Sequence, residues 1–233
     1  PVIRTCKPEQ FERWRSIGYG IFGHAGRISP EVDQIMRSYG ILPFDELFCA
    51  YTSSERIKSR NYFKGLEVPD GRHFMYIRNK EAFFTDYAGP ETCLLPDYRL
   101  MGGWSEDYVR QFKKIIREEI LKGAPKSAYG IGSEWAAEIK DDPHYPDLVN
   151  AYFEAVHDVY PNAWVYEGGG MNMHSHDGVR QVDVFLERMK ERGYKLPDFL
   201  IGHPYCGQGG INQVYDNFKA LIKVAEKHNL PNC

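Results

Sequence analysis

The sequence predicts an α/β fold built on a parallel sheet. Short apolar segments alternate with helical patterns along most of the chain, and predicted strands begin near residues 128, 163 and 198, at intervals close to 35 residues. One strand, its connections and one long helix need about this length, and alternating strands and helices are typical of parallel sheets. Two arrangements satisfy the pattern, a closed (β/α)8 barrel and an open doubly wound sheet. Because no glycine-rich phosphate loop follows the first strand, the nucleotide-binding version of the open sheet is disfavoured.

In the N-terminal half, turn and cap residues separate three predicted strands. Pro8 suits the first turn of a helix over 7–16. Ser29 is typical of an N-cap and Gly40 of a helix end, which together predict a second helix over 29–40. The predicted strands of this half are 2–5, 19–24 and 45–51.

The C-terminal half has the clearest helical periodicity. Ser105 is the predicted N-cap of a helix that Gly123 ends, and the apolar residues between them recur on one helical face. Three strands and three further helices continue the alternation. They are the strands 128–133, 163–167 and 198–203 and the helices 146–160, 177–193 and 211–229.

Residues 52–104 are less regular, and we interpret them as a long insertion into a single domain that covers residues 1–233. Within this insertion, the segment 73–87 is predicted to form a hairpin that turns at Asn79 and Lys80. Two interpretations of the insertion stay open, a lid or wall of a binding cleft and a plain surface excursion.

Composition and charge exclude some classes of partner. The formal net charge is −3 and no run of Lys or Arg occurs, so we expect no nucleic-acid partner. No apolar stretch reaches the roughly 18–20 residues that a membrane-spanning helix needs. Aromatic residues make up 14% of the chain, which fits either core packing or stacking on sugar rings.

Cysteine usage and the first residues bear on the compartment. The five cysteines include no CxxC pair, so neither a zinc site nor a disulfide framework is predicted. Residues 1–10 do not resemble a signal peptide, although a secreted chain would have lost such a peptide on maturation. The working hypothesis is an extracellular or secreted protein.

A carboxylate beside an indole follows the predicted strand 128–133. In both parallel arrangements the carboxyl ends of the strands carry the ligand-binding residues. Burial of Glu134 next to Trp135 is expected to raise the pKa of its carboxyl group, and such a group can act as a general acid near neutral pH. The alternative is that Glu134 caps the following helix or lies in its first turn.

Other strand ends add candidate substrate-binding residues. Glu167 precedes three glycines and either binds substrate hydroxyls or caps a turn. His203 and Tyr205 can donate hydrogen bonds to a substrate, and His24 is a further candidate contact. Trp135 offers an aromatic face to a sugar ring. A parallel sheet would bring these separated residues to one edge.

Two segments resemble motifs of the clan-A glycoside hydrolases. "YGIGSEW" (129–135) is similar to the strand-4 motif of that clan, in which an apolar strand ends in the acid/base Glu, and "PDFLIGHPY" (197–205) is similar to its strand-6 motif. The resemblance implies a (β/α)8 TIM-barrel-like fold with Glu134 as acid/base and with His203 and Tyr205 shaping the active site. Ser133 departs from the pattern, since the clan usually has Asn there to bind the sugar 2-hydroxyl.

The resemblance implies that the second catalytic carboxylate would lie beyond residue 233. Retaining glycosidases place a nucleophilic carboxylate about 5–5.5 Å from the acid/base, and in this clan it lies at the end of strand 7. The chain stops at Cys233, before any predicted strand 7 or 8. The expected fold is therefore a barrel with strands 1–6 present and strands 7–8 missing, completed by the remainder of the same chain or by another chain.

The leading hypothesis is a retaining glycoside hydrolase that acts on an oligo- or polysaccharide and needs no cofactor. Glu134 would be the general acid/base, and the nucleophile would be a Glu beyond residue 233. One alternative is a non-catalytic carbohydrate-binding or structural module of a larger assembly. The other is a metal-dependent barrel enzyme that uses Glu134, Glu167 and histidines, although no carboxylate motif accompanies His174 and His176, so no metal site is predicted.

Overall fold

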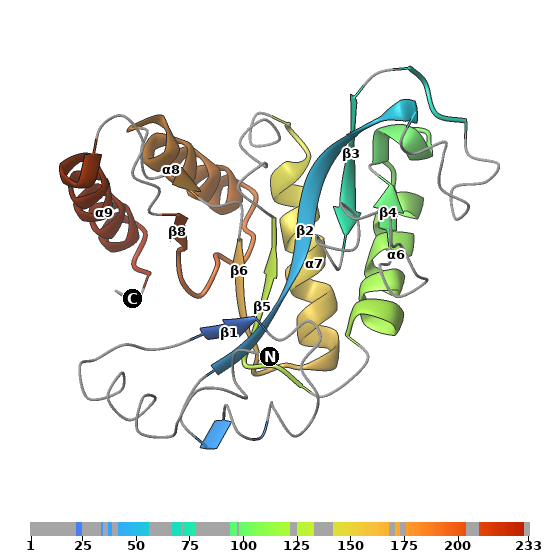
Figure 1. Ribbon diagram of the computed structural model, residues 1–233. Helices are drawn as coiled ribbons and strands as arrows, with labels where there is room; N and C mark the ends of the chain where they lie inside the picture. The colour runs from blue at the N-terminus through green and yellow to red at the C-terminus, as the bar shows by residue number, and fades with distance from the viewer. Residues whose placement is uncertain are drawn as a thin grey trace, which may run out of the picture.

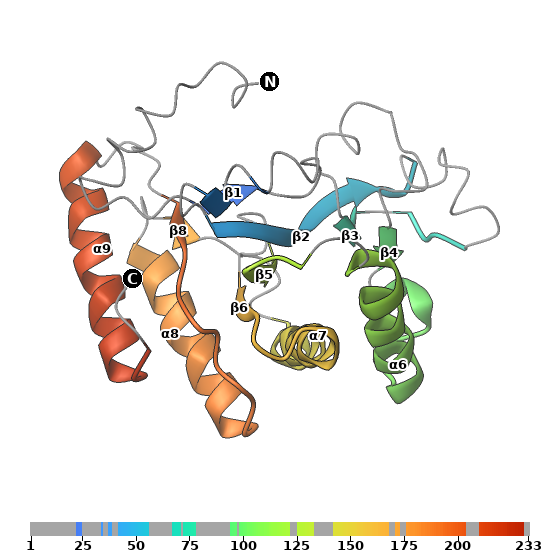
Figure 2. The same ribbon diagram turned by 90° about the horizontal axis from the view of Figure 1, so that it is seen from below.

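The structure, a computed structural model, has an open sheet with helices packed on one face. It describes residues 22–24, 34, 37–38, 42–55, 67–70, 72–77, 94–96, 98–121, 125–132, 142–167, 171–172, 176–203 and 210–230. Figure 2 shows the helices on the same face of the sheet: α6 (Glu106–Ile115), α7 (Tyr145–Val159), α8 (His176–Glu191) and α9 (Gly210–Lys227). The main core lies between these two layers.

The main sheet is built around the long strand β2 (Leu42–Ser53), which Figure 1 shows beside the shorter strands. The other strands are β1 (Phe22–His24), β3 (Arg72–Ile77), β4 (Leu94–Pro96), β5 (Ala128–Ile131) and β6 (Trp164–Glu167). The strand order is β4-β3-β2-β5-β6, and β1 also pairs with β2. β1, β2, β5 and β6 are parallel, whereas β3 pairs antiparallel with both β2 and β4.

The predicted (β/α)8 barrel is wrong. The described strands form an open sheet whose two ends are β4 and β6. The strand expected at 198–203 is reduced to β8 (Gly202–His203), which pairs with β7 (Met171–Asn172) in a separate two-stranded parallel sheet. A barrel requires each strand to pair with the next around a closed circle. Here the described pairing stops at β6, and the antiparallel strands of the insertion extend the other end of the sheet.

The N-terminal predictions are only partly covered by the described residues. The predicted strand 2–5 and helix 7–16 lie outside them. The predicted helix 29–40 is represented by Gln34, Arg37 and Ser38, which are all helical. Of the predicted strand 19–24, the described residues form β1, and the predicted strand 45–51 is confirmed as β2, which extends beyond it at both ends.

The C-terminal helices are confirmed within a few residues of their predicted bounds. Ser105 is the N-cap of α6, and its hydroxyl accepts a hydrogen bond from the Tyr108 N–H at 3.1 Å. A π-helical turn, η4 (Ile116–Ile120), continues α6, and the predicted end at Gly123 lies outside the described residues. Local capping chemistry therefore determines where this helix begins.

α7 lies at the centre of the helical layer. It contacts β5 and β6 on the sheet side, and α6 and α8 as neighbours. Val149 and Val156 are fully buried, as are Tyr152 and Ala155. Burying a valine-sized side chain contributes about 1.5–3 kcal/mol relative to leaving it exposed, so α7 is the principal apolar support of the sheet.

The insertion adds an antiparallel extension to the sheet. β3 confirms the first strand of the predicted hairpin, but its antiparallel partners are β2 and β4. The predicted turn at Asn79 and Lys80 and the second hairpin strand lie outside the described residues. A short 3₁₀ helix, η3 (Tyr98–Met101), follows β4 and leads into α6.

Candidate functional site

The carboxyl ends of β5 and β6 lie side by side at one edge of the sheet. Ile131 pairs with Leu47 on one side and with Glu167 on the other. The Gly132 N–H then donates to the Leu47 carbonyl oxygen at 2.9 Å, and Gly132 has a φ of 118°, a conformation that favours glycine. The chain leaves β5 at Gly132, two positions before Glu134. The segment that contains Glu134 therefore begins at the same edge of the sheet at which β6 ends.

Glu167 is a buried carboxylate at this edge. Only 8% of its surface is exposed, and its Oε1 accepts a hydrogen bond from the Tyr145 hydroxyl at 2.5 Å. Tyr145 is the first residue of α7, and its ring lies against Phe185 of α8 with centroids 5.7 Å apart. Because side chains alternate along a strand, Glu167 shares the face of Val165, which packs in the helix-side core. Glu167 therefore ties the end of β6 to the start of α7.

An aromatic cluster joins the end of the insertion to the connection between β5 and α7. The rings of Trp104 and His144 stack with centroids 4.7 Å apart and an interplanar angle of 9°. Tyr98 lies edge-on to both rings, and its hydroxyl donates to Asp142 Oδ2 at 2.7 Å. Since this connection leads directly into Tyr145, the cluster of Tyr98, Trp104 and His144 lies near the sheet edge at which Glu167 ends β6.

The opposite face of the sheet carries a closely packed aromatic group. A Cβ on Gly130 would lie 2.2 Å from Tyr166 Cζ, so the Tyr166 ring covers the backbone of β5 at a distance that only glycine allows. Tyr166 stacks on Phe199 with centroids 4.9 Å apart and meets Phe44 edge-on at 6.2 Å. The glycine in "YGIG" is therefore explained by packing on the neighbouring strand.

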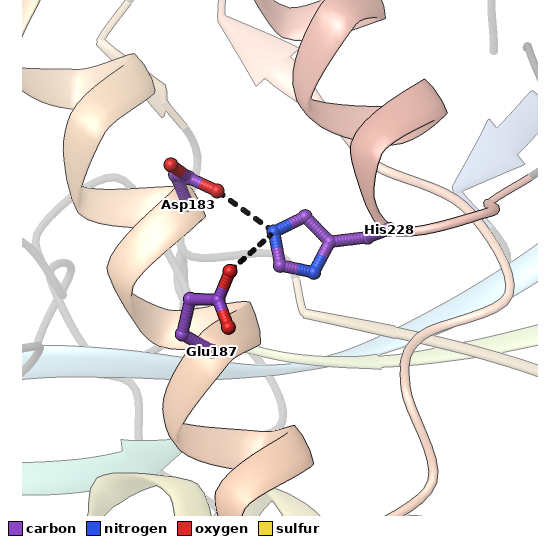
Figure 3. A group of neighbouring side chains, drawn as sticks. All are labelled: Asp183, Glu187 and His228. Carbon is purple, nitrogen blue, oxygen red and sulfur yellow. Dashed lines mark hydrogen bonds and ion pairs between the residues drawn. The ribbon is translucent and has the colours of Figure 1, made fainter.

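A cluster of charged side chains joins α8 to the end of α9 (Figure 3). His228 is fully buried, and its Nε2 lies 2.7 Å from Asp183 Oδ1 and 3.8 Å from Glu187 Oε1. The Lys227 ammonium lies 2.8 Å from Asp183 Oδ1 and 3.0 Å from Glu187 Oε1. The hydrogen bonds from Lys227 are the main cause that lowers the pKa values of Asp183 and Glu187, and the same bonds raise the pKa of Lys227.

This cluster has the residue types of a metal site, but a lysine lies within it. Among the described residues, Asp183, Glu187 and His228 are the group whose potential ligand atoms lie within 4.8 Å of one another. Lys227 already places a positive charge between the two carboxylates. The arrangement is therefore an ion-pair network that joins two helices. None of its residues lies at a predicted strand end, so none of them was among the predicted site residues. The only local indication in the sequence was that Asp183 and Glu187 lie four positions apart on a predicted helix and therefore share one helical face.

The remaining predicted site residues are located only in part. Glu134, Trp135 and Tyr205 lie outside the described residues. The backbone of His24 pairs with Phe44 of β2, three positions before Leu47, the residue that pairs with Ile131 at the end of β5. The backbone of His203 pairs with Asn172, which follows the end of β6 in the chain. The structure thus brings the ends of β5 and β6 together but leaves His24 nearer the start of β5.

Comparisons with known proteins do not assign the chain to a family. A scan against protein-family models and a search of curated proteins both found no match to this chain. None of the helices in the described ranges combines the length and apolar character that crossing a membrane requires.

Proposed function

We propose that the protein is a retaining glycoside hydrolase that acts on an oligo- or polysaccharide. The observation that carries this proposal is the pairing of Ile131 with Glu167, because the segment containing Glu134 leaves the sheet where a buried carboxylate ends the next strand. The resemblance of residues 129–135 to an acid/base motif supplies the reaction class.

In this proposal Glu134 protonates the glycosidic oxygen as the bond to the anomeric carbon breaks. A nucleophilic carboxylate, placed beyond residue 233 by the resemblance, forms an ester bond to that carbon. Glu134 then takes a proton from water, whose oxygen bonds to the anomeric carbon and releases the nucleophile. Proton and charge balance over the two steps, and no cofactor takes part.

Glu167 would bind a sugar hydroxyl beside the reacting bond. An ionised carboxylate has about four acceptor positions, so the bond from Tyr145 leaves acceptor capacity. Tyr145 would act as a positioning residue, because its hydroxyl fixes the Glu167 carboxylate in a buried setting. His203 and Tyr205 would bind further hydroxyls, while Trp135 and the aromatic residues of segment 98–104 would offer aromatic contacts.

The test is chemical rescue of Glu134→Ala in the full-length protein. Loss of general acid catalysis should slow hydrolysis of an unactivated oligosaccharide about 10²–10⁴-fold. A 2,4-dinitrophenyl glycoside needs no protonation of its leaving group, so its glycosyl-enzyme still forms. Added azide should then accelerate turnover by attacking the anomeric carbon, which yields a glycosyl azide with the substrate's anomeric configuration.

The matched control is Glu138→Ala, which removes a carboxylate four positions further along the same segment. This variant should hydrolyse both substrates at the wild-type rate. If Glu134→Ala keeps wild-type turnover on the unactivated oligosaccharide, Glu134 is not the acid/base and the proposed mechanism is wrong.

The second candidate is a carbohydrate-binding protein without hydrolytic activity. Ser133 favours it, because the clan usually has Asn at this position to bind the sugar 2-hydroxyl. Oligosaccharide binding by the wild-type protein without turnover of any activated glycoside would select this candidate. Turnover that depends on Glu134 would exclude it.

A further inference from the structure

A hollow of about 490 Å³ lies where β6 begins, at the opposite end of that strand from Glu167. It is lined by Trp164, by residues 196–199 and by residues 228–230 after α9. Its volume is within the range of about 300–1,000 Å³ that is typical of small-molecule sites. None of the residues expected to act at the carboxyl ends of the strands lines it.

The hollow contains a half-exposed tryptophan supported by buried rings. Trp164 has 46% of its surface exposed, whereas Phe199 beside it has 7%. The two rings meet edge-on with centroids 6.1 Å apart, and Phe199 stacks in turn on Tyr166. The backbone of Trp164 is also held in place, because its main-chain N–H donates to the Ser127 carbonyl oxygen at 3.0 Å. The indole therefore rests on a fixed support and still presents a large apolar surface to solvent.

Two polar residues, Asp198 and Asn229, line the hollow beside this indole. Asp198 Oδ2 accepts a hydrogen bond from the Val165 N–H at 2.7 Å, and Asp198 Oδ1 lies 3.1 Å from Lys195 Nζ. Asn229 is exposed and has a φ of 56°, and its backbone N–H donates to the Glu226 carbonyl oxygen at 3.1 Å. The Asp198 carboxylate and the Asn229 side-chain amide can bind neighbouring hydroxyl groups, since together they supply acceptors and donors.

We propose that this hollow is a second carbohydrate-binding site, in which a sugar ring stacks on Trp164 and its hydroxyls bond to Asp198 and Asn229. An apolar ring surface with a polar rim matches a pyranose, which has apolar C–H faces and hydroxyls around its edge. The inference rests on the proposed function for the choice of carbohydrate as ligand class. The site would hold a polysaccharide chain without taking part in cleavage.

The hollow is separate from the proposed catalytic edge. Trp164 and Glu167 are three positions apart on β6, which corresponds to about 10 Å along a strand. They also point to opposite faces of the sheet, because side chains alternate. One sugar ring cannot contact both residues, so binding at the two places can be measured independently.

The experiment uses ¹⁹F NMR of the protein labelled with 5-fluorotryptophan, in a Glu134→Gln background that prevents hydrolysis. The chain has four tryptophans, and Trp164→Phe and Trp135→Phe variants assign one signal to each region. The probes are cellotetraose, xylotetraose, mannotetraose and laminaritetraose, with adenosine as a flat aromatic competitor. The Trp164 signal reports on the hollow, whereas the Trp135 signal reports on the proposed catalytic segment.

We expect at least one tetrasaccharide to shift the Trp164 signal in a saturable manner. Trp164→Ala should then weaken binding of that tetrasaccharide at least about tenfold, or ~1.4 kcal/mol. Because this variant lacks the Trp164 signal, its binding is measured from the broadening of the tetrasaccharide's own NMR lines. Tyr215→Ala, which removes an exposed aromatic ring of α9, is the matched control and should leave the dissociation constant unchanged. Circular dichroism of each variant checks that it is folded.

Two outcomes would overturn the inference. One is that no tetrasaccharide shifts the Trp164 signal, and the other is that adenosine shifts it as strongly as the best sugar. These outcomes can be distinguished from failure of the proposed function. In that case sugars would leave the Trp135 signal unchanged and would still shift the Trp164 signal.

Discussion

Removal of the Tyr145 hydroxyl should destabilise the protein through its effect on Glu167. Tyr145 is 1% exposed and Glu167 8%, and the bond between them is 2.5 Å long. Tyr145→Phe keeps the ring and its contact with Phe185 but leaves a buried carboxylate oxygen without this donor. A hydrogen bond to a charged group contributes about 1.5–3 kcal/mol, so we expect a loss of that size in the free energy of unfolding.

The assay is urea unfolding followed by tryptophan fluorescence, supported by the thermal midpoint. For a domain of this size, 1 kcal/mol shifts the midpoint by about 2–4 °C, so the expected decrease is roughly 3–12 °C. Glu167→Leu combined with Tyr145→Phe should cost less than the sum of the single changes, because removing both polar partners leaves neither unsatisfied. Tyr215→Phe on the exposed face of α9 is the control and should change stability by less than about 0.5 kcal/mol.

A Tyr145→Phe variant as stable as the Tyr215→Phe control would refute the reasoning. So would strict additivity in the double variant, since it would mean that Tyr145 and Glu167 do not interact energetically. Either result would also remove Tyr145 from its proposed positioning role at the sheet edge.

Two further predictions concern packing and charge. Gly130→Ala should destabilise the protein by about 1–3 kcal/mol, because its Cβ would lie 2.2 Å from Tyr166 Cζ. Since Tyr166→Ala removes the ring that this Cβ would meet, the double variant should lose less stability in urea unfolding than the sum of the two single changes, and equal stability of Gly130→Ala and wild type would contradict the close contact. The Lys227 hydrogen bond lowers the pKa of Asp183 below its ordinary value of 3.8, so this interaction stabilises the fold above that pH and is lost as the pH falls through the lowered pKa. Urea midpoints measured from pH 6 to pH 2 should therefore fall more steeply for wild type than for Asp183→Asn, and parallel curves would rule out this contribution.

Much of the helical structure could be predicted because it depends on neighbouring residues. Ser105 caps α6 through a bond to a residue three positions away, as the sequence indicated. The apolar periodicities of α7, α8 and α9 likewise place their bounds within a few residues. The position of β5 and the glycine after it also follow from the local pattern of "YGIG".

The candidate site was predictable only in outline. The sequence identified Glu167 as a strand-end carboxylate, but it did not indicate Tyr145 as its partner, 22 positions away. It also could not assign Glu167 to the helix-facing side, since alternation fixes which residues share a face and not which face meets the helices. The cluster of Asp183, Glu187 and His228 required the packing of α8 against α9.

The sequence by itself therefore determined the bounds of α6 to α9 within a few residues, the Ser105 cap, and the parallel relation of β5 and β6, because these follow from short-range periodicity and from the length of the helical connection between the strands. Only the tertiary structure decided that the sheet is open. That result depends on the antiparallel pairing of β2 with β3 and on β8 pairing with β7. Hydrogen bonds between distant segments have no signature in the residues that form them, so a barrel and an open sheet share the same local pattern.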